Sequence, residues 1–437
     1  MDGNFTDSLT NLVSGMGTGR DKASAARYSL DLQSPHDLLV AYKASSLARR
    51  VVNLRAEDST REWREWQGDP DQISAIEAEE KRHGLQQKVL RARKLARLFG
   101  GSALLIGTGE KDLTRPLDPA TIRVGGLRYL TLLTTQDCTA EGWQDDPTLP
   151  GFGDPEYWQL RGDLQVHPSR LVLFHGQEPM YEFGLDATPG FGDSVLRGGL
   201  KAVQDVDAAA ANILSLLYEA KVDVFKIPQF SDRLAARGSE YAAKVLERLT
   251  LAATAKGISG ALLMDSSEEY EQKTATLTGL DNTAYMFMQL ASAAHGYPMA
   301  LLFGMSAGGL NASGDIDIRG YYDSVKVEQA MMMEPAMSLL DEALIRSALG
   351  DRPDEIHFNW RPLWQPSSKE RAENADKIAT AVQKLRDVVS PEALSAAAIN
   401  ALTETGAFPG LEQAAADHPF DEDDITVGQV RRGMEPE

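Results

Sequence analysis

The stretch HGYPMALLFGMSAGGLNASGDIDIRGYYDSVKVEQ, residues 295–329, decides the architecture because it joins two helices through a segment of different character. A helix is predicted from about Asp281 to His295, with Asp281 or Asn282 as its cap, and Gly-Tyr-Pro at 296–298 ends it. After the short apolar piece ALLF, the chain is too rich in Gly, Ser and Asn for regular structure. We therefore predict a loop between two helices.

The second of these helices is the longest helical signal in the chain, from about Ile318 to Leu349. At ~1.5 Å per residue, such a helix spans roughly 45 to 50 Å. Pro335 lies well inside it, where a proline removes a hydrogen bond and usually bends the axis. The sequence predicts one long helix with a kink at Pro335.

A compact module precedes residue 281. The helix that leads into it is predicted to begin at Asp193 or Ser194, and its apolar residues keep helical spacing over about six turns. A strand, VDVFKI, follows and is closed by Pro228, and a charged helix runs from about Ser239 to Ala255. GISGALLMD and EYEQKTATL then predict a pair of strands. A β-α-β-β module therefore lies between two helices.

The N-terminal part is predicted to be helical first and β-rich afterwards. Residues 1–33 are rich in Gly, Ser, Thr and Asn and predict a flexible arm. One helix is predicted over residues 34–63, starting at Ser34 or Pro35, and a second from about Asp71 to Phe99, ended by two glycines. SALLIGTG predicts a buried strand, and short β-rich runs follow over residues 127–176.

The C-terminal part is predicted to be mainly helical. HFNWRPLW is a short strand-like run, and residues from Ser367 to about Thr405 are rich in alanine, with a helix restart at Ser390-Pro391-Glu392. The last stretch is acidic. The fold class that these elements predict is α+β and mainly helical.

The charge of the chain limits what it does with nucleic acid. It has 44 basic and 64 acidic residues, a net charge of −20. A protein that grips DNA by its phosphates should be basic, because the release of counterions drives that binding. Either the chain has nothing to do with nucleic acid, or it lets nucleic acid pass without sticking.

Length and cysteine content set further limits. With 437 residues the chain is long enough for two to four domains. Its one cysteine, Cys138, excludes an internal disulfide, fits assembly in a reducing cytoplasm and is interpreted as a structural thiol. No apolar run reaches the ~18 to 20 residues of a membrane-spanning helix, so we expect no membrane partner.

Gly304-Met305-Ser306-Ala307-Gly308 matches the G-x-S-x-G motif of serine hydrolases. That motif needs a strand before the serine and a helix directly after it. ALLF satisfies the first condition, but GGLNASGD follows, which no helix favours. Only His357 and His418 lie downstream as partners. A flexible loop is the stronger interpretation, and a hydrolase would be revealed by labelling of Ser306 with a fluorophosphonate probe.

Three further patterns have a functional and a structural interpretation. Asp315 and Asp317 suit half of a Mg²⁺ or Ca²⁺ site, but acids also favour the start of a helix. The methionines of EQAMMMEPAM suit an adaptable surface, or packing in the core or between subunits. The basic cluster at 81–97 suits nucleic acid, or a salt-bridged helix face. We favour packing for the methionines and capping for the acids, and predict no metal site, cofactor or catalytic residue.

The order of these elements resembles the core of phage portal proteins. The segment from Gly308 to Tyr322, with GGLNASG, a following acidic-Arg pair and Tyr-Tyr-Asp, is similar to a prophage-associated branch of that family. LARRVVNLRAEDSTREW resembles the opening helix of that branch, and HPSRLVLFHG resembles one of its wing strands. The resemblance extends from about Ser34 to Ser390.

The resemblance implies a division of the chain into the parts of a portal subunit. A wing at 34–192 follows the arm, and 193–219 and 279–297 form the two stem helices. Between them lies the clip, 220–278. The tunnel loop is 298–317, the long kinked helix and its strand are 318–366, the crown helices are 367–410, and the acidic tail is 411–437.

The tunnel loop is the part that the resemblance places next to DNA. Its glycines let it bend as DNA moves. The residues expected to line the channel there are Gly304, Ser306, Gly308, Gly309, Asn311, Ser313, Gly314, Asp315 and Asp317.

The resemblance also implies the partners. It implies a ring of twelve subunits at one vertex of the capsid in the virion, assembled in the host cytoplasm. Its partners are the large subunit of the terminase, the major capsid protein, the head-tail adaptor and double-stranded DNA, which passes without sequence specificity. The portal itself hydrolyses nothing, and the same subunit serves a phage or a gene transfer agent. A monomeric adaptor or scaffold is the alternative, and it predicts one copy in solution.

Overall fold

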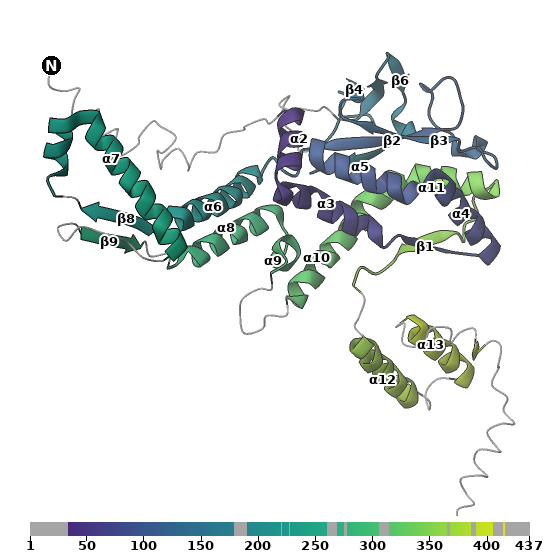
Figure 1. Ribbon diagram of the computed structural model, residues 1–437. Coiled ribbons are helices and arrows are strands. Elements are labelled where there is room, and N and C mark those ends of the chain that lie inside the picture. Colours follow the sequence, from purple (N-terminus) through teal and green to yellow (C-terminus); the bar gives the residue numbers. More distant parts are fainter. Residues whose placement is uncertain are drawn as a thin grey trace, which may run out of the picture. The chain divides into compact units, whose positions relative to one another are not determined.

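The computed structural model divides into two compact units, Met1–Arg361 and Pro362–Glu437 (Figure 1). The structure describes residues 34–178, 190–219, 221–226, 228–259, 269–274, 278–305, 314–364, 368–385, 390–404 and 414–415. The predicted arm at 1–33 lies outside these ranges, as does the acidic tail apart from residues 414–415.

The first predicted helix is two helices, α2 (Pro35–Ala44) and α3 (Ser46–Arg61). Its predicted start is confirmed: Ser34 and Asp37 form a capping box, in which each side chain accepts from the other residue's backbone N–H. The single-helix prediction is wrong at Ser45, whose backbone is extended and whose hydroxyl accepts from the Ala48 N–H. A serine side chain that bonds the backbone locally competes with helix continuation.

The second predicted helix is also divided, into α4 (Pro70–His83) and α5 (Leu85–Phe99). Gly84 between them has φ 58°, a left-handed conformation that ends a helix and costs glycine little. The predicted end at Gly100 is confirmed, with φ 93°. A side chain there would also collide, because its Cβ would lie 2.3 Å from the Gly192 carbonyl oxygen.

The predicted β-rich region is confirmed as two three-stranded antiparallel sheets. In the first, β2 (Gly101–Gly107), buried along its whole length, lies between β3 (Tyr129–Thr134) and β7 (Leu171–His175). The second has the order β4 (Cys138–Trp143), β5 (Pro155–Leu160), β6 (Leu164–Val166). Cys138 is buried in this region, and burial raises the pKa of its thiol to about 12, as a structural thiol requires.

The long helical segment is confirmed and begins three residues earlier than predicted. It consists of α10 (Asp315–Glu328), a π-helical turn (Gln329–Met333) and α11 (Glu334–Leu349). The π-helical turn directly precedes the first turn of α11, which holds Pro335, and the predicted kink at Pro335 stays a prediction. Met333 and Met337 are buried in the main core, with residues of α4, α5, β2 and β7, so the packing interpretation is confirmed for them.

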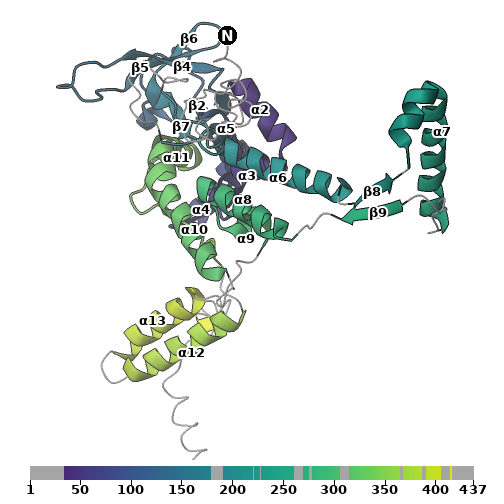
Figure 2. The same cartoon turned by 90° about the vertical axis from the view of Figure 1, so that its left-hand side faces the viewer.

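Two helices pack side by side, α6 (Leu200–Glu219) and α8 (Leu280–His295) (Figures 1 and 2). Helix α6 begins later than predicted, because residues 195–199 form turns. The predicted cap of α8 at Asp281 or Asn282 is wrong: its N-cap is Gly279, and Asp281 lies in the first turn.

Between α6 and α8 the chain forms β8 (Lys221–Lys226), α7 (Phe230–Ser259) and β9 (Glu269–Thr274). Strand β8 pairs with β9 in antiparallel register, Val224 opposite Glu271. Of the predicted pair GISGALLMD and EYEQKTATL, the second contributes β9, and the prediction of a strand in the first is wrong over its first three residues. Residues 257–259 of GISGALLMD belong to α7, and residues 260–265 lie outside the described residues.

The remaining elements complete the two units. Strand β1 (Arg64–Gln67), which the sequence analysis did not predict, pairs with the predicted strand β10 (His357–Trp360). In the second unit, α12 (Ser368–Leu385) and α13 (Pro391–Glu404) confirm the predicted restart. Among the described helices, none is long and apolar enough to cross a membrane.

Candidate functional site

The candidate site is the predicted loop between α9 (Met299–Phe303) and α10, of which the structure describes residues 304–305 and 314, together with the side chains that hold its two ends. Gly304 follows α9 with φ 71°, and Gly314 precedes α10 with φ 65°. A Cβ on Gly314 would lie 3.8 Å from the Cβ of Ala300, so the chain at the start of α10 lies close to α9. Both turns use a backbone conformation that favours glycine.

Of the nine residues predicted to line a channel, Gly304, Gly314, Asp315 and Asp317 are described. Asp315 and Asp317 both lie in the first turn of α10, where the negative charge of a carboxylate interacts favourably with the helix dipole. In the described parts of the chain, no group of three or more His, Cys, Asp or Glu side chains is arranged to hold a metal ion. Ser306, Gly308, Gly309, Asn311 and Ser313 lie outside the described residues.

The serine hydrolase motif also loses its first structural condition, the strand before the serine. Residues 300–303, the ALLF that would have to be a strand, belong to helix α9. The interpretation of ALLF as a strand is therefore wrong, because the break at Pro298 starts a new helical turn instead of extended backbone. His357, one of the two possible partners, lies exposed on β10.

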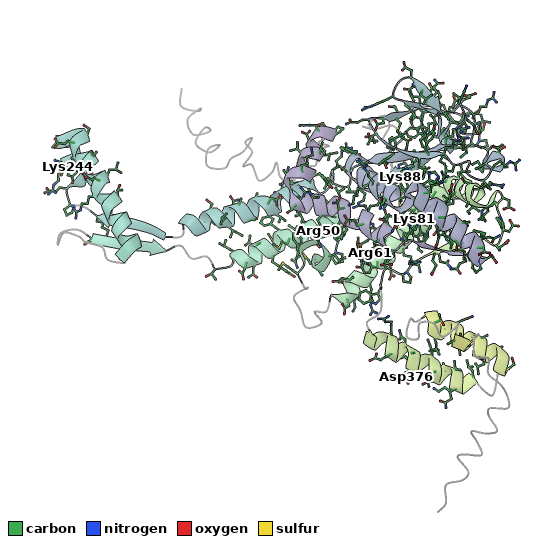
Figure 3. All side chains as sticks on the ribbon, turned by 45° about the vertical axis from the view of Figure 1, so that its right-hand side comes forward. Arg50, Arg61, Lys81, Lys88, Lys244 and Asp376 are labelled. Carbon is green, nitrogen blue, oxygen red and sulfur yellow. The ribbon has the colours of Figure 1, made fainter. Side chains whose placement is uncertain are left out.

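The first end of the loop is held by Arg50 of α3. Its guanidinium donates from Nε and Nη2 to the main-chain oxygen of Leu301, over 2.8 and 2.6 Å. Leu301 lies in α9, three residues before Gly304. Figure 3 labels Arg50 where α3 meets this part of the chain.

Tyr297, between α8 and α9, is buried against α3 and α5. Its hydroxyl accepts from Arg97 Nη2 over 2.7 Å and donates to the Val51 carbonyl oxygen over 2.9 Å. Arg97 also donates from Nε to the Val52 carbonyl oxygen, over 2.9 Å. Burial raises the pKa of Tyr297 and lowers that of Arg97. The phenol of Tyr297 is therefore neutral and keeps the proton that it donates to Val51.

The second end of the loop leads into α10, which is held by Tyr321 and Glu328. The Tyr321 hydroxyl donates to Asp58 of α3 over 2.9 Å. The Glu328 carboxylate accepts from Arg55 of α3 and from Arg93 of α5. Burial alone would raise the pKa of Glu328, but the two guanidinium groups outweigh it and lower the pKa to about 2.

These side chains form one polar junction beneath both ends of the loop. We define the polar junction by its members, Arg55, Asp58, Arg93, Arg97, Tyr297, Tyr321 and Glu328. Arg93 and Arg97 come from the basic cluster at 81–97. The salt-bridged interpretation of that cluster is confirmed for Arg93, which pairs with Glu328, and for Arg82, which pairs with Glu79, whereas Arg97 donates to neutral oxygens. Lys94 likewise pairs with Glu57 over 2.5 Å, and Lys88 donates to the Leu130 carbonyl oxygen over 2.9 Å.

Sequence reasoning missed Tyr297 and Glu328 as the anchors of the loop. The signal was available in part, because an acid surrounded by Val, Gln, Ala and Met on a long helix is a candidate for a buried ion pair. Its partners on α3 and α5 lie 273 and 235 residues away in the chain, which no local pattern reveals.

Apolar side chains remain exposed on α6 and α8 after these two helices pack against each other. Leu214 is 52% exposed and Leu290 is 55% exposed, and Leu216 and Met286 are nearly as open. A pair of long helices with uncovered apolar residues is typical of a protein that buries them against other chains.

Comparison with known families identifies the class. The family model described as phage portal protein matches residues 36–384. This match includes both ends of the loop, the polar junction, α6 and α8. The chain belongs to the phage portal protein family.

Among curated proteins, similar chains include the anti-CBASS protein Acb1 of Caulobacter sp. (strain RHG1), 38% identical over 94% of this chain and 69% of that protein. The protein of the same name from Sphingomonas paeninsulae is 35% identical over 94% of this chain and 67% of its own length. An uncharacterized protein of Haemophilus influenzae is 28% identical over 93% of this chain and 92% of its own.

Among solved structures, the fold is shared with the neck of an empty gene transfer agent (GTA) particle, with a TM-score of 0.52 at 14% identity, over 88% of this chain and 97% of that chain. A chain of the virion of a native GTA particle gives the same TM-score at 13% identity, over 89% and 97%. The expected α+β, mainly helical portal fold is thereby confirmed.

Proposed function

We propose that this chain is the subunit of a portal ring, in which twelve copies surround a central channel for double-stranded DNA. In this proposal α6 and α8 are the stem and β8, α7 and β9 belong to the clip. The loop from Gly304 to Asp317 is the tunnel loop, and α12 and α13 are the crown. The observation that carries it is a glycine-bounded loop whose two ends are fixed to one buried polar junction.

A loop whose two ends are held by the polar junction suits a channel. A segment that touches moving DNA must change conformation without unfolding the subunit that carries it. Glycines at both ends allow that change at low cost. The buried bonds of Tyr297 and Glu328 hold α9 and α10 in place while it happens.

The exposed apolar residues of α6 and α8 support a closed ring. A heterologous contact repeated between identical copies either closes into a ring or continues as a filament. Leu214 and Leu290 would be covered by the stem of the neighbouring copy. The exposed apolar side chains of one copy would then be buried against a second copy of the same protein.

The acidic charge supports a channel that releases DNA. With a net charge of −20, and with Asp315 and Asp317 at the end of the loop, the chain repels phosphates more than it attracts them. DNA then passes without sequence-specific contacts. The energy for movement would come from the ATPase of the terminase, and no catalytic role is proposed for this chain.

Family membership supports the remaining partners. We propose that the ring lies at one vertex of a virion or gene transfer agent particle and is assembled in the host cytoplasm. It would contact the major capsid protein, the large subunit of the terminase and the head-tail adaptor.

The test is the assembly state of the purified full-length chain. Negative-stain electron microscopy should show rings with a central hole, and the mass in solution should be that of about twelve copies. A single copy at all concentrations would instead support a monomeric adaptor or scaffold and would overturn the proposal.

A further inference from the structure

A groove lies where α3, α6, α8 and α9 meet, and the portal function proposed above does not use it. It has a volume of about 540 Å³, within the ~300–1,000 Å³ of specific binding clefts. Its apolar lining comes from all four helices and includes Leu54, Val206, Met288, Leu302 and Phe303. Several of these side chains are only partly buried, so the groove is accessible to an apolar partner.

The rim of this groove has two arginines that form no ion pair with the described residues. Arg49 and Arg50 both line it, and both donate to main-chain carbonyl oxygens: Arg49 to Lys43 over 2.9 Å, Arg50 to Leu301. Of the two acids at the rim, Glu57 pairs with Lys94, while Asp207 accepts from the neutral Ser45 hydroxyl over 2.9 Å and keeps its charge. Asp207 therefore balances one of the two arginines, and a positive charge remains at the rim. The groove therefore suits an apolar segment with negative charge.

The first residues of the chain contain such a segment. In NFTDSLTNLVSGM, residues 4–16, every large apolar side chain falls at helical spacing: Phe5, Leu9, Leu12, Val13 and Met16. At 100° per residue these five positions occupy about 100° of a helix surface, and the polar residues occupy the rest. Residues 1–19 include Asp2 and Asp7 and no lysine or arginine.

This segment needs a partner in order to form a helix. It is short and rich in Ser, Thr and Asn, and isolated helices of fewer than ~12–15 residues are marginal even for alanine-rich sequences. Docking of the apolar stripe into a groove would supply the missing stability, because tertiary packing of an amphipathic face is what stabilises most helices in proteins.

The segment can reach the groove. Helix α2 has 10 residues, about 15 Å, and leads from Ser34 to Ser45, whose hydroxyl bonds Asp207 at the rim. Residues 17–34 can extend by up to about 60 Å at ~3.3 Å per residue. That length allows docking in the groove of the same copy or of a neighbour.

We propose that residues 4–16 bind as an amphipathic helix in the groove between α3, α6, α8 and α9, with Leu9 and Leu12 toward Met288 and Phe303. The N-terminal segment then contacts α9 directly ahead of the Gly304 loop. It would be part of the packed structure of the assembled protein.

Disulfide trapping in the full-length chain tests this directly. The only native cysteine, Cys138, is 2% exposed and does not compete. In the double variant Leu9→Cys with Met288→Cys, mild oxidation should produce a crosslink in most chains, because a disulfide needs Cβ atoms about 3.5–4.5 Å apart. The crosslink supports the proposal whether it forms within one copy or between two.

Two matched pairs serve as controls. Asn11→Cys, on the polar side of the segment, should crosslink poorly to Met288→Cys. Leu9→Cys should crosslink poorly to Met286→Cys, which lies on the same helix but 49% exposed and outside the groove lining. Adding Leu12→Asp to the Leu9/Met288 pair should lower the yield at least about tenfold, because a charge would enter an apolar groove.

The proposal is overturned if the Leu9/Met288 pair gives no crosslink while circular dichroism shows the folded chain. It is also overturned if the control pairs crosslink as efficiently, because the contact would then be random collision.

Discussion

The guanidinium of Arg97 donates a hydrogen bond to the hydroxyl of Tyr297 over 2.7 Å, although the two residues are 200 positions apart in the chain. Both side chains are buried. Through this bond α5 holds the short connection between α8 and α9, and so fixes the start of the Gly304 loop.

Tyr297→Phe should therefore lower the free energy of unfolding by about 1–3 kcal/mol, because a buried donor of Arg97 and the Val51 carbonyl oxygen each lose a partner. Urea unfolding followed by circular dichroism measures it. Tyr129→Phe, at a tyrosine that is 41% exposed, is the control and should be neutral. Equal stability of both variants would show that the buried hydroxyl contributes nothing.

Glu328→Gln should lower the free energy of unfolding by about 3 kcal/mol. That is the lower end of the range for breaking a buried ion pair, since the amide oxygen can still accept one bond while Arg55 and Arg93 lose their counter-charge. Urea midpoints at neutral pH measure the change. Glu240→Gln, which breaks an exposed pair with Lys244 on α7, is the matched control and should produce no measurable change. A neutral Glu328→Gln would contradict a stabilising role for the polar junction.

The stability from Glu328 should also depend on pH with a definite sign. Its pKa is lowered from 4.5 to about 2, so the folded state binds this proton less readily than the unfolded state. The contribution is fully present above about pH 4.5 and is lost as the pH falls toward about 2. The difference in urea midpoint between the native chain and Glu328→Gln should therefore shrink over that range. A constant difference down to pH 2 would assign the effect to packing.

Deletion of Gly308 to Gly314 should leave ring assembly intact and impair DNA packaging. The bonds of Tyr297, Tyr321 and Glu328 lie outside the deleted residues. Electron microscopy checks the ring, and the DNA content of particles produced with the variant checks packaging. Loss of the ring itself would show that the loop is a structural part of the assembly.

Leu290→Glu should prevent ring assembly without unfolding the subunit. The side chain is 55% exposed in one copy, so a charge there is tolerated, whereas a subunit interface would have to bury it. Light scattering after gel filtration measures the mass, and circular dichroism checks the fold. Val124→Glu, at a residue that is 68% exposed outside the two helices, is the control and should still assemble.

How much the sequence predicts differs between elements and contacts. The long helix at 315–349, the buried strand β2 and the β-rich region follow from local periodicity and are confirmed. The breaks at Ser45 and Gly84 were missed, because a serine or glycine inside a helical pattern ends the helix only where the surrounding fold turns the chain.

The sequence by itself determined the order of the elements, the acidic charge and the position of the glycine-rich loop between two helices. These depend on residue type and spacing along the chain. Only the tertiary structure decided which side chains hold the loop. Arg55, Arg93 and Arg97 belong to charged helical stretches that look solvated in the sequence. In the fold Arg93 and Arg97 are buried and Arg55 is partly buried, because side chains of α3 and α5 meet Glu328 of α10. A buried charge needs its partner within a few ångströms, and proximity of residues hundreds of positions apart is set by packing and not by spacing.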